Sequence, residues 1–150
     1  VTEFKVKGNK LYLSPIIDLF NQEIISYEVT DRPVFKGVMD MLKKSLPQAK
    51  GSEQLVLHSD QGWQYQMQKY QQLLRENGIK QSMSRKGNCL DNAVIENFFG
   101  TLKSECFHRM KFSNRAEVEQ AVAEYVQFYN FERINLKDGL IPHEIRSKAA

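Results

Sequence analysis

The stretch Leu55-Val56-Leu57-His58-Ser59-Asp60 is an apolar run that ends in a carboxylate. A run of this kind predicts a short buried strand, with Asp60 at the strand's carboxyl end. A second stretch, Asp91 to Lys103, predicts a helix that carries Glu96, and residues 61–95, thirty-five in all, separate the two carboxylates. A carboxylate at a strand end that faces one on a helix can hold a divalent cation, because Mg²⁺ prefers carboxylate oxygens and retained waters.

The composition is that of a single soluble globular domain. The 150 residues are 41% hydrophobic and 26% charged, which is enough to bury a full core. No run approaches the roughly 18 apolar residues of a membrane span, and no signal peptide opens the chain. The two cysteines, Cys89 and Cys106, lack metal-type spacing, so we expect a reduced, cytoplasmic chain without a membrane partner. The net charge of +3 gives only a mild bias toward polyanions.

The order of the predicted elements favours an α/β fold. The first thirty residues predict three antiparallel strands, with a turn at Gly8-Asn9. Asp31 is a plausible N-cap for a helix that Pro47 ends. A helix over 66–76 then joins the strand ending at Asp60 to a short strand over 79–83, which predicts a parallel pair. We therefore expect a mixed five-stranded sheet with helices on both faces.

Four segments in order carry a shared pattern. They are His58-Ser59-Asp60-Gln61-Gly62, Asn92 to Glu96, Lys103, and the tail Tyr129-Asn130-Phe131-Glu132-Arg133 with Pro142-His143-Glu144. Together they resemble the catalytic core of bacterial insertion-sequence transposases, which are related to retroviral integrases. In that family thirty-five residues separate a second Asp from a Glu, and a Lys or Arg follows the Glu by seven. The resemblance covers nearly the whole chain.

The resemblance implies a ribonuclease-H-like fold with an Asp-Asp-Glu triad that holds two Mg²⁺ or Mn²⁺ ions. Asp60 and Glu96 are then the catalytic residues and metal ligands. The family's first Asp normally sits two residues before a Thr at the head of the first strand, and this chain opens at Val1-Thr2. We therefore expect a core truncated just after its first catalytic Asp, and a chain that is inactive alone. Asp18 is a possible substitute, although a polar residue at a strand end is the simpler interpretation.

Several basic and amide side chains are candidates for DNA contacts. Lys103 lies roughly 10 Å along the helix from Glu96, a reach that lets it bind a phosphate while Glu96 holds metal. Asn92 falls on the same stripe, and Arg85 and Lys86 form a basic loop. A solvated surface position is the alternative for each of these charges.

The resemblance also implies the activity. The parent protein would bind the DNA ends of its element, cut a strand with water, and join the freed 3′-hydroxyl to target DNA as a homo-oligomer assembled on DNA. No covalent protein–DNA intermediate is then needed. A non-catalytic or decayed nucleic-acid-binding domain of the same fold is the main alternative, and another ribonuclease-H-like nuclease is a third.

Overall fold

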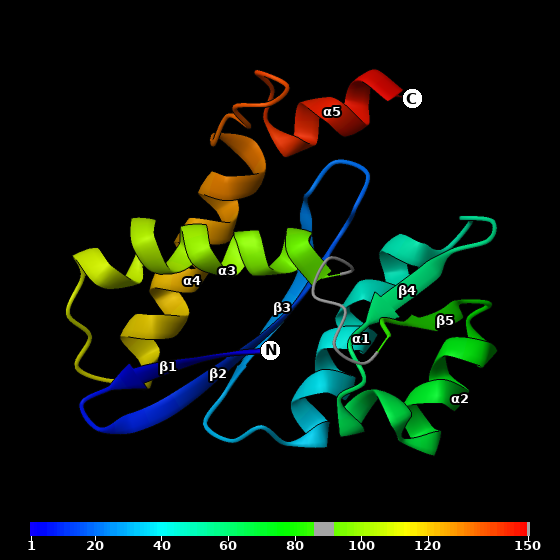
Figure 1. Cartoon of the computed structure of the whole chain (residues 1–150), viewed down its shortest axis with the longest axis horizontal. Helices are drawn as coiled ribbons and strands as arrows, with labels where there is room; N and C mark the ends of the chain where they lie inside the picture. Colours follow the sequence, from blue (N-terminus) through cyan, green and yellow to red (C-terminus); the bar gives the residue numbers. More distant parts are fainter. Residues whose placement is uncertain (86–91, 150) are drawn as a thin grey trace.

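The chain folds into two small sheets surrounded by helices (Figure 1). The computed structural model describes residues 1–85 and 92–149. One sheet is antiparallel and contains β1 (Thr2–Val6), β2 (Asn9–Ile17) and β3 (Ile24–Thr30) in that order, and the other is a parallel pair of β4 (Val56–Ser59) and β5 (Lys80–Met83). The predicted α/β class, the antiparallel meander and the parallel pair are confirmed.

The helical segments in chain order are α1 (Phe35–Ala49), the 3-10 turn η1 (Trp63–Gln66), α2 (Gln68–Glu76), α3 (Ala93–Glu105), the turn η3 (Phe107–Arg109), α4 (Arg115–Phe131) and α5 (Pro142–Ala149). Helices α3 and α4 cover one face of the antiparallel sheet, α1 covers the other, and α2 packs against the parallel pair. Two predicted helix boundaries are wrong. The N-cap of α1 is Val34 rather than Asp31, and the helix continues through Pro47 to Ala49. Proline in the last turn removes only one hydrogen bond near the helix end, so the helix tolerates it there.

The predicted single five-stranded sheet is wrong, because the described strands form separate groups of three and two. The Val1 ammonium lies close enough to Asp60, the residue after β4, for their charges to interact. The start of β1 is therefore near the end of β4, but the two strands belong to different sheets and are not paired (Figure 1). This leaves β4 less covered than expected for a buried strand, and Val56 is 54% exposed.

Two hydrophobic cores hold these layers together. The first lies between the antiparallel sheet and helices α3 and α4, and Leu13, Phe98, Leu102, Val118 and Val122 are its most buried members. Alternation along β3 explains the two faces: Val29 enters this core, whereas the Ser26 hydroxyl donates to the Met41 carbonyl of α1 at 2.9 Å.

The second core joins α1, α2 and the parallel pair. It contains Val38 and Leu42 of α1, Tyr70 and Leu74 of α2, and Ile79, which precedes β5. Leu57 of β4 packs against it. The strand that leads to Asp60 is therefore anchored in a different core from α3.

A buried asparagine joins the C-terminal half of the chain to the sheet. Asn130, 5% exposed near the end of α4, accepts a hydrogen bond from the Ile24 N–H at 2.8 Å and donates to the Ile24 carbonyl at 3.0 Å. Its side chain thus satisfies both backbone groups of the first residue of β3. At the other end of α4, the Asn114 side chain caps the helix by accepting from the Glu117 N–H at 3.0 Å.

We expect Asn130→Ala to destabilise the domain by at least about 2 kcal/mol, because two buried backbone groups lose their partners. Urea unfolding measures the loss, with Asn97→Ala on the exposed side of α3 as the control, expected to change stability by less than about 0.5 kcal/mol. Equal stability of the two variants would contradict this role for Asn130.

Candidate active site

Asp60 stands at the carboxyl end of β4 with its side chain exposed. Its Oδ1 accepts a hydrogen bond from the Gly62 N–H at 2.8 Å, so one carboxylate oxygen fixes the turn that follows the strand. A Cβ at Gly62 would lie 2.9 Å from the same oxygen, which favours glycine at this position. Among the described residues, Oδ2 accepts no hydrogen bond and remains available to a ligand.

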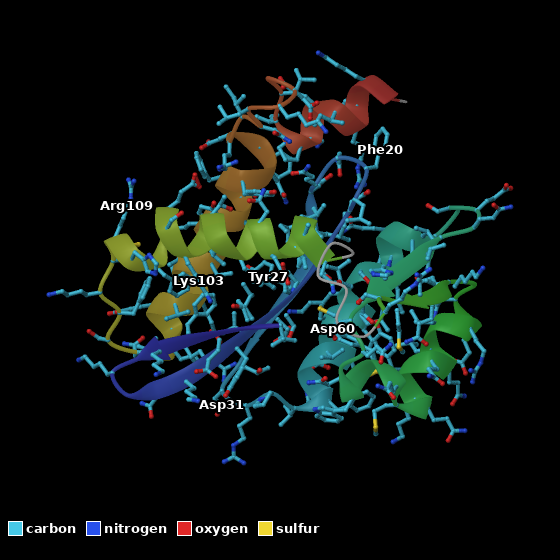
Figure 2. All side chains as sticks on the ribbon, in the orientation of Figure 1. Phe20, Tyr27, Asp31, Asp60, Lys103 and Arg109 are labelled. Carbon is cyan, nitrogen blue, oxygen red and sulfur yellow. The ribbon has the colours of Figure 1, made fainter. Side chains whose placement is uncertain are left out.

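Asp60 lies near the middle of the view in Figure 2, and two charged or titratable neighbours define its surroundings. The Val1 ammonium is one, and its pKa is lowered by burial, which the negative charge of Asp60 partly opposes. Tyr65 of η1 is the other, since burial together with the charge of Asp60 raises its pKa to about 12. Asp60 therefore lies beside both the start of β1 and the turn η1.

Ser84 connects the end of β4 to the start of α3. Its N–H donates to the Ser59 carbonyl at 2.8 Å, and its hydroxyl lies 3.3 Å from the same oxygen. That hydroxyl also accepts from the Asn92 amide at 3.0 Å. Ser59 precedes Asp60, and Asn92 is one helical turn before Glu96, so this buried serine links the two segments that carry the carboxylates.

Glu96 lies in the first turn of α3 with its side chain exposed. Phe98 and Leu102 on the opposite side of the helix are 1% and 0% exposed, respectively, and they fix the rotation of the helix. A carboxylate in the first turn also interacts favourably with the helix dipole. In Figure 1 this end of α3 points toward the region where β4 ends.

The far end of α3 is held by a polar cluster. Glu105 accepts hydrogen bonds from the Tyr125 hydroxyl at 2.6 Å and from Arg133 Nε at 3.0 Å. Burial alone would raise the pKa of Glu105, but these hydrogen bonds and the charge of Arg133 outweigh it and lower the pKa. The helix that carries Glu96 is therefore tied to α4 as well as to Ser84.

The predicted DNA-contacting residues have different surroundings. Arg85 is exposed, the Asn92 amide donates to Ser84, and Lys86 lies outside the described residues. Lys103 is half-buried, with Nζ 5.6 Å from the centre of the Phe4 ring. Lys103 therefore packs over the first strand, in addition to lying on the stripe that it shares with Asn92 and Glu96.

Asp18, the possible substitute for a first catalytic carboxylate, and Glu3, an acidic residue near the start of β1, are both engaged in ion pairs. Asp18 pairs with Arg146 of α5 at 2.6 Å, and Glu3 pairs with Lys10 at 3.3 Å. Among residues 1–85 and 92–149, no group of three or more His, Cys, Asp or Glu side chains could hold a metal ion. Asp60 and Glu96, with exposed carboxylates, have the oxygen donors that a hard cation prefers.

Sequence reasoning missed Ser84, and no local signal identifies it. A serine before a basic loop has the same composition as an ordinary polar connection, and only the tertiary fold places it between Ser59 and Asn92. His58 has a similar structural contact, with Nδ1 2.9 Å from the Ser82 hydroxyl across the parallel pair.

The arrangement of the elements is that of integrase-type catalytic cores. The HTLV-2 integrase catalytic core domain, solved in complex with magnesium in a trimeric form, has a TM-score of 0.77, is 16% identical, and the match covers 96% of this chain and 90% of that one. The BIV integrase catalytic core domain has a TM-score of 0.68 and is 17% identical, and the match covers 99% of this chain and 91% of that one. At these identities the likeness shows the fold alone.

Sequence comparison defines the family. Residues 1–89 match the Integrase core domain family, and residues 96–149 match a second family of the same description. The InsK protein of insertion sequence element IS150 from Escherichia coli is 60% identical over 149 residues, which cover 99% of this chain and 53% of InsK. An uncharacterized transposase-like protein of Haemophilus influenzae is 51% identical over 150 residues, which cover 99% of this chain and 69% of that protein.

This chain therefore belongs to the integrase core domain family of insertion-sequence transposases. It spans about half the length of the Escherichia coli relative. Within the described ranges, no helix combines the length and the apolar character needed to cross a membrane.

We expect Ser84→Ala to loosen the start of α3. Removing the hydroxyl breaks the contact with Asn92 but keeps the backbone bond to Ser59, so the amides of Asn97 and Phe98 should exchange hydrogen faster, at a cost of about 1 kcal/mol in stability. Hydrogen exchange by NMR measures this. Ser104→Ala, on the exposed side of the same helix, is the control, and identical exchange in both variants would refute the link.

The Glu105 cluster makes stability depend on acid pH. Because the pKa of Glu105 is lower in the folded than in the unfolded chain, the unfolded chain binds more protons and stability rises with pH. The stabilisation is complete above the ordinary glutamate pKa of about 4.3 and is lost as pH falls through the lower folded value. Glu105→Gln should flatten the dependence of the urea midpoint between about pH 6 and pH 3, whereas Glu53→Gln on an exposed loop should keep the wild-type slope.

Proposed function

We propose that this chain is the catalytic core of a DNA transposase that cleaves and transfers DNA strands with the aid of divalent metal ions. The observation that carries the proposal is the link through Ser84, which joins the strand end bearing Asp60 to the helix turn before Glu96. The family supports the same activity, since a Lactococcus lactis relative, 37% identical over 136 residues, is the transposase for insertion sequence element IS904.

Asp60 and Glu96 would hold Mg²⁺ or Mn²⁺ through their exposed carboxylates. Asp60 offers Oδ2, while Oδ1 keeps the side chain oriented by its bond to Gly62. Two bound ions would lower the pKa of the attacking water or hydroxyl and offset charge on the leaving oxygen. The burial of Phe98 and Leu102 restricts the rotation of α3 and so keeps Glu96 outside the core.

We also propose that Asp60 and Glu96 need further oxygen donors to hold the metal tightly. Mg²⁺ keeps its waters unless several carboxylates or substrate phosphates replace them, so two carboxylates alone would hold it weakly. We therefore propose that residues 1–150 alone have little activity.

DNA is the proposed substrate, and Lys103, Arg85, Lys86 and Asn92 are the proposed contacts. We include a homo-oligomer in the proposal, since the HTLV-2 integrase core of the same fold has been solved in dimeric and trimeric forms. The alternative of a decayed, non-catalytic domain is not favoured, because both carboxylate positions are occupied by acidic residues that are exposed.

We expect Asp60→Asn and Glu96→Gln in the full-length parent protein each to reduce Mg²⁺-dependent cleavage of element-end DNA by at least about 10³-fold. Loss of a metal ligand removes several kcal/mol of transition-state stabilisation, and each 1.36 kcal/mol is about tenfold in rate. A gel assay for nicked strands measures the rate with Mg²⁺ and with chelator.

Two remote acids provide controls. Asp138→Asn and Glu53→Gln make the same chemical changes at exposed positions and should keep the wild-type rate. DNA binding should survive Glu96→Gln, because the carboxylate is not needed to contact phosphate. Cleavage within tenfold of wild type by either Asp60→Asn or Glu96→Gln would overturn the proposed roles.

A further inference from the structure

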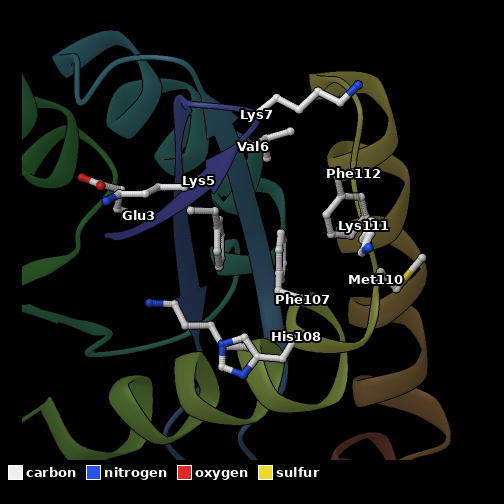
Figure 3. Close-up of a pocket in the computed structure, with 11 residues that line it drawn as sticks. Glu3, Lys5, Val6, Lys7, Phe107, His108, Met110, Lys111 and Phe112 are labelled. Atoms are coloured by element: carbon white, nitrogen blue, oxygen red, sulfur yellow. The ribbon is translucent and has the colours of Figure 1, made fainter.

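A groove of about 540 Å³ lies beside β1 (Figure 3). Strand β1 is at the edge of its sheet and forms one wall. The end of α3 and residues 107–112 form the rest. One lining residue, Lys103, lies on α3 together with Glu96, and none belongs to the segment around Asp60.

Positive charge dominates the rim of this groove. Lys5, Lys7, Lys103 and Lys111 line it, and none of them forms an ion pair with the described part of the chain. The one acidic residue in the lining, Glu3, is paired with Lys10. Lys7, Lys103 and Lys111 therefore supply the positive charge around the groove, whereas the Lys5 side chain extends past Glu3, away from Phe107 and Phe112 (Figure 3).

The floor of the groove is aromatic and apolar. Phe4 and Phe107 stack with ring centres 3.9 Å apart, and Phe112 lies 5.1 Å from Phe107. Met110 at the mouth is 51% exposed. Phe4 is only 5% exposed, so the partly buried Phe107 and Phe112 are the rings that a ligand could reach. Lysines beside accessible rings are a combination that proteins use to hold a nucleic acid strand, with lysines on phosphates and rings against sugars and bases.

We propose that this groove binds a stretch of the DNA strand at a distance from the reacting phosphate. The proposal rests on the proposed function and adds a second contact surface to it. Lys103 belongs to both contact surfaces, because it lies on α3 with Glu96 and also packs over Phe4 in the groove.

Distances along α3 and β1 give the separation between the groove and the carboxylates. Glu96 and Lys103 are about 10 Å apart along α3, and Val1 and Lys7 about 20 Å apart along β1. At about 3.4 Å of duplex axis per nucleotide, the groove contacts phosphates roughly three to six nucleotides from the cleaved bond. An acidic peptide is the other polyanion of suitable charge, and the test separates it from DNA.

The test compares two double variants in the 150-residue chain. Lys7→Gln with Lys111→Gln removes two groove charges, and Lys69→Gln with Lys80→Gln removes two exposed charges on α2 and β5. Binding of a fluorescent 20-base-pair duplex is measured by anisotropy over a salt series without divalent metal. Thermal melting confirms that each variant is folded, as expected for exposed lysines.

We expect the groove variant to bind DNA at least tenfold more weakly at low salt, with the slope of log K against log salt reduced by about two. The control variant should keep the wild-type slope. An unchanged slope in the groove variant would overturn the proposal and leave these lysines as charges that protect a sheet edge. Tighter binding of polyglutamate than of DNA, lost in the same variant, would assign the groove to an acidic peptide and also overturn it.

Failure of the groove proposal differs from failure of the proposed function. Glu96→Gln should leave the affinity and the salt slope unchanged while it removes cleavage by the parent protein. If cleavage needs neither carboxylate but the groove variant still loses its salt slope, the catalytic proposal fails and the groove remains a DNA-binding surface. If cleavage depends on both carboxylates but the groove variant binds like wild type, the groove proposal alone fails.

Discussion

Burial of one side of α3 against the antiparallel sheet is the constraint on which the candidate site depends. Phe98 and Leu102 are almost completely enclosed by residues of the sheet and of α4, so the helix cannot rotate without opening the first core. Glu96 is consequently held on the exposed side. Ser84 holds the start of the helix and Glu105 holds its end. These contacts at both ends of α3 fix the position of the Glu96 backbone.

The candidate site lies where two separately packed halves meet. Asp60 follows a strand that packs against α1 and α2 in the second core, whereas Glu96 belongs to a helix of the first core. Hydrogen bonds of Ser84 to Ser59 and Asn92 join the halves directly. The positions of the two carboxylates relative to each other therefore depend on how these two cores are joined.

Much of the fold was predictable from local pattern, but the links between segments were not. Alternation in the first thirty residues and the helix between two short strands correctly predicted both kinds of pairing. The prediction of a single five-stranded sheet was wrong because strand propensity says nothing about where β1 begins relative to β4. The roles of Asp60 and Glu96 came from their spacing and the family resemblance, and they remain proposals. Ser84 and the packing of Lys103 over Phe4 depend on residues distant in sequence, which periodicity does not reveal.

Whether Asp60 and Glu96 share a metal ion can be tested by locating manganese in crystals of this chain soaked at high Mn²⁺ concentration. Anomalous diffraction locates the ion without reference to activity. We expect a peak between the carboxylates of Asp60 and Glu96, within coordination distance of both, that is lost in Glu96→Gln. A well-occupied peak elsewhere, or carboxylates of Asp60 and Glu96 that face opposite sides of the molecule, would contradict it.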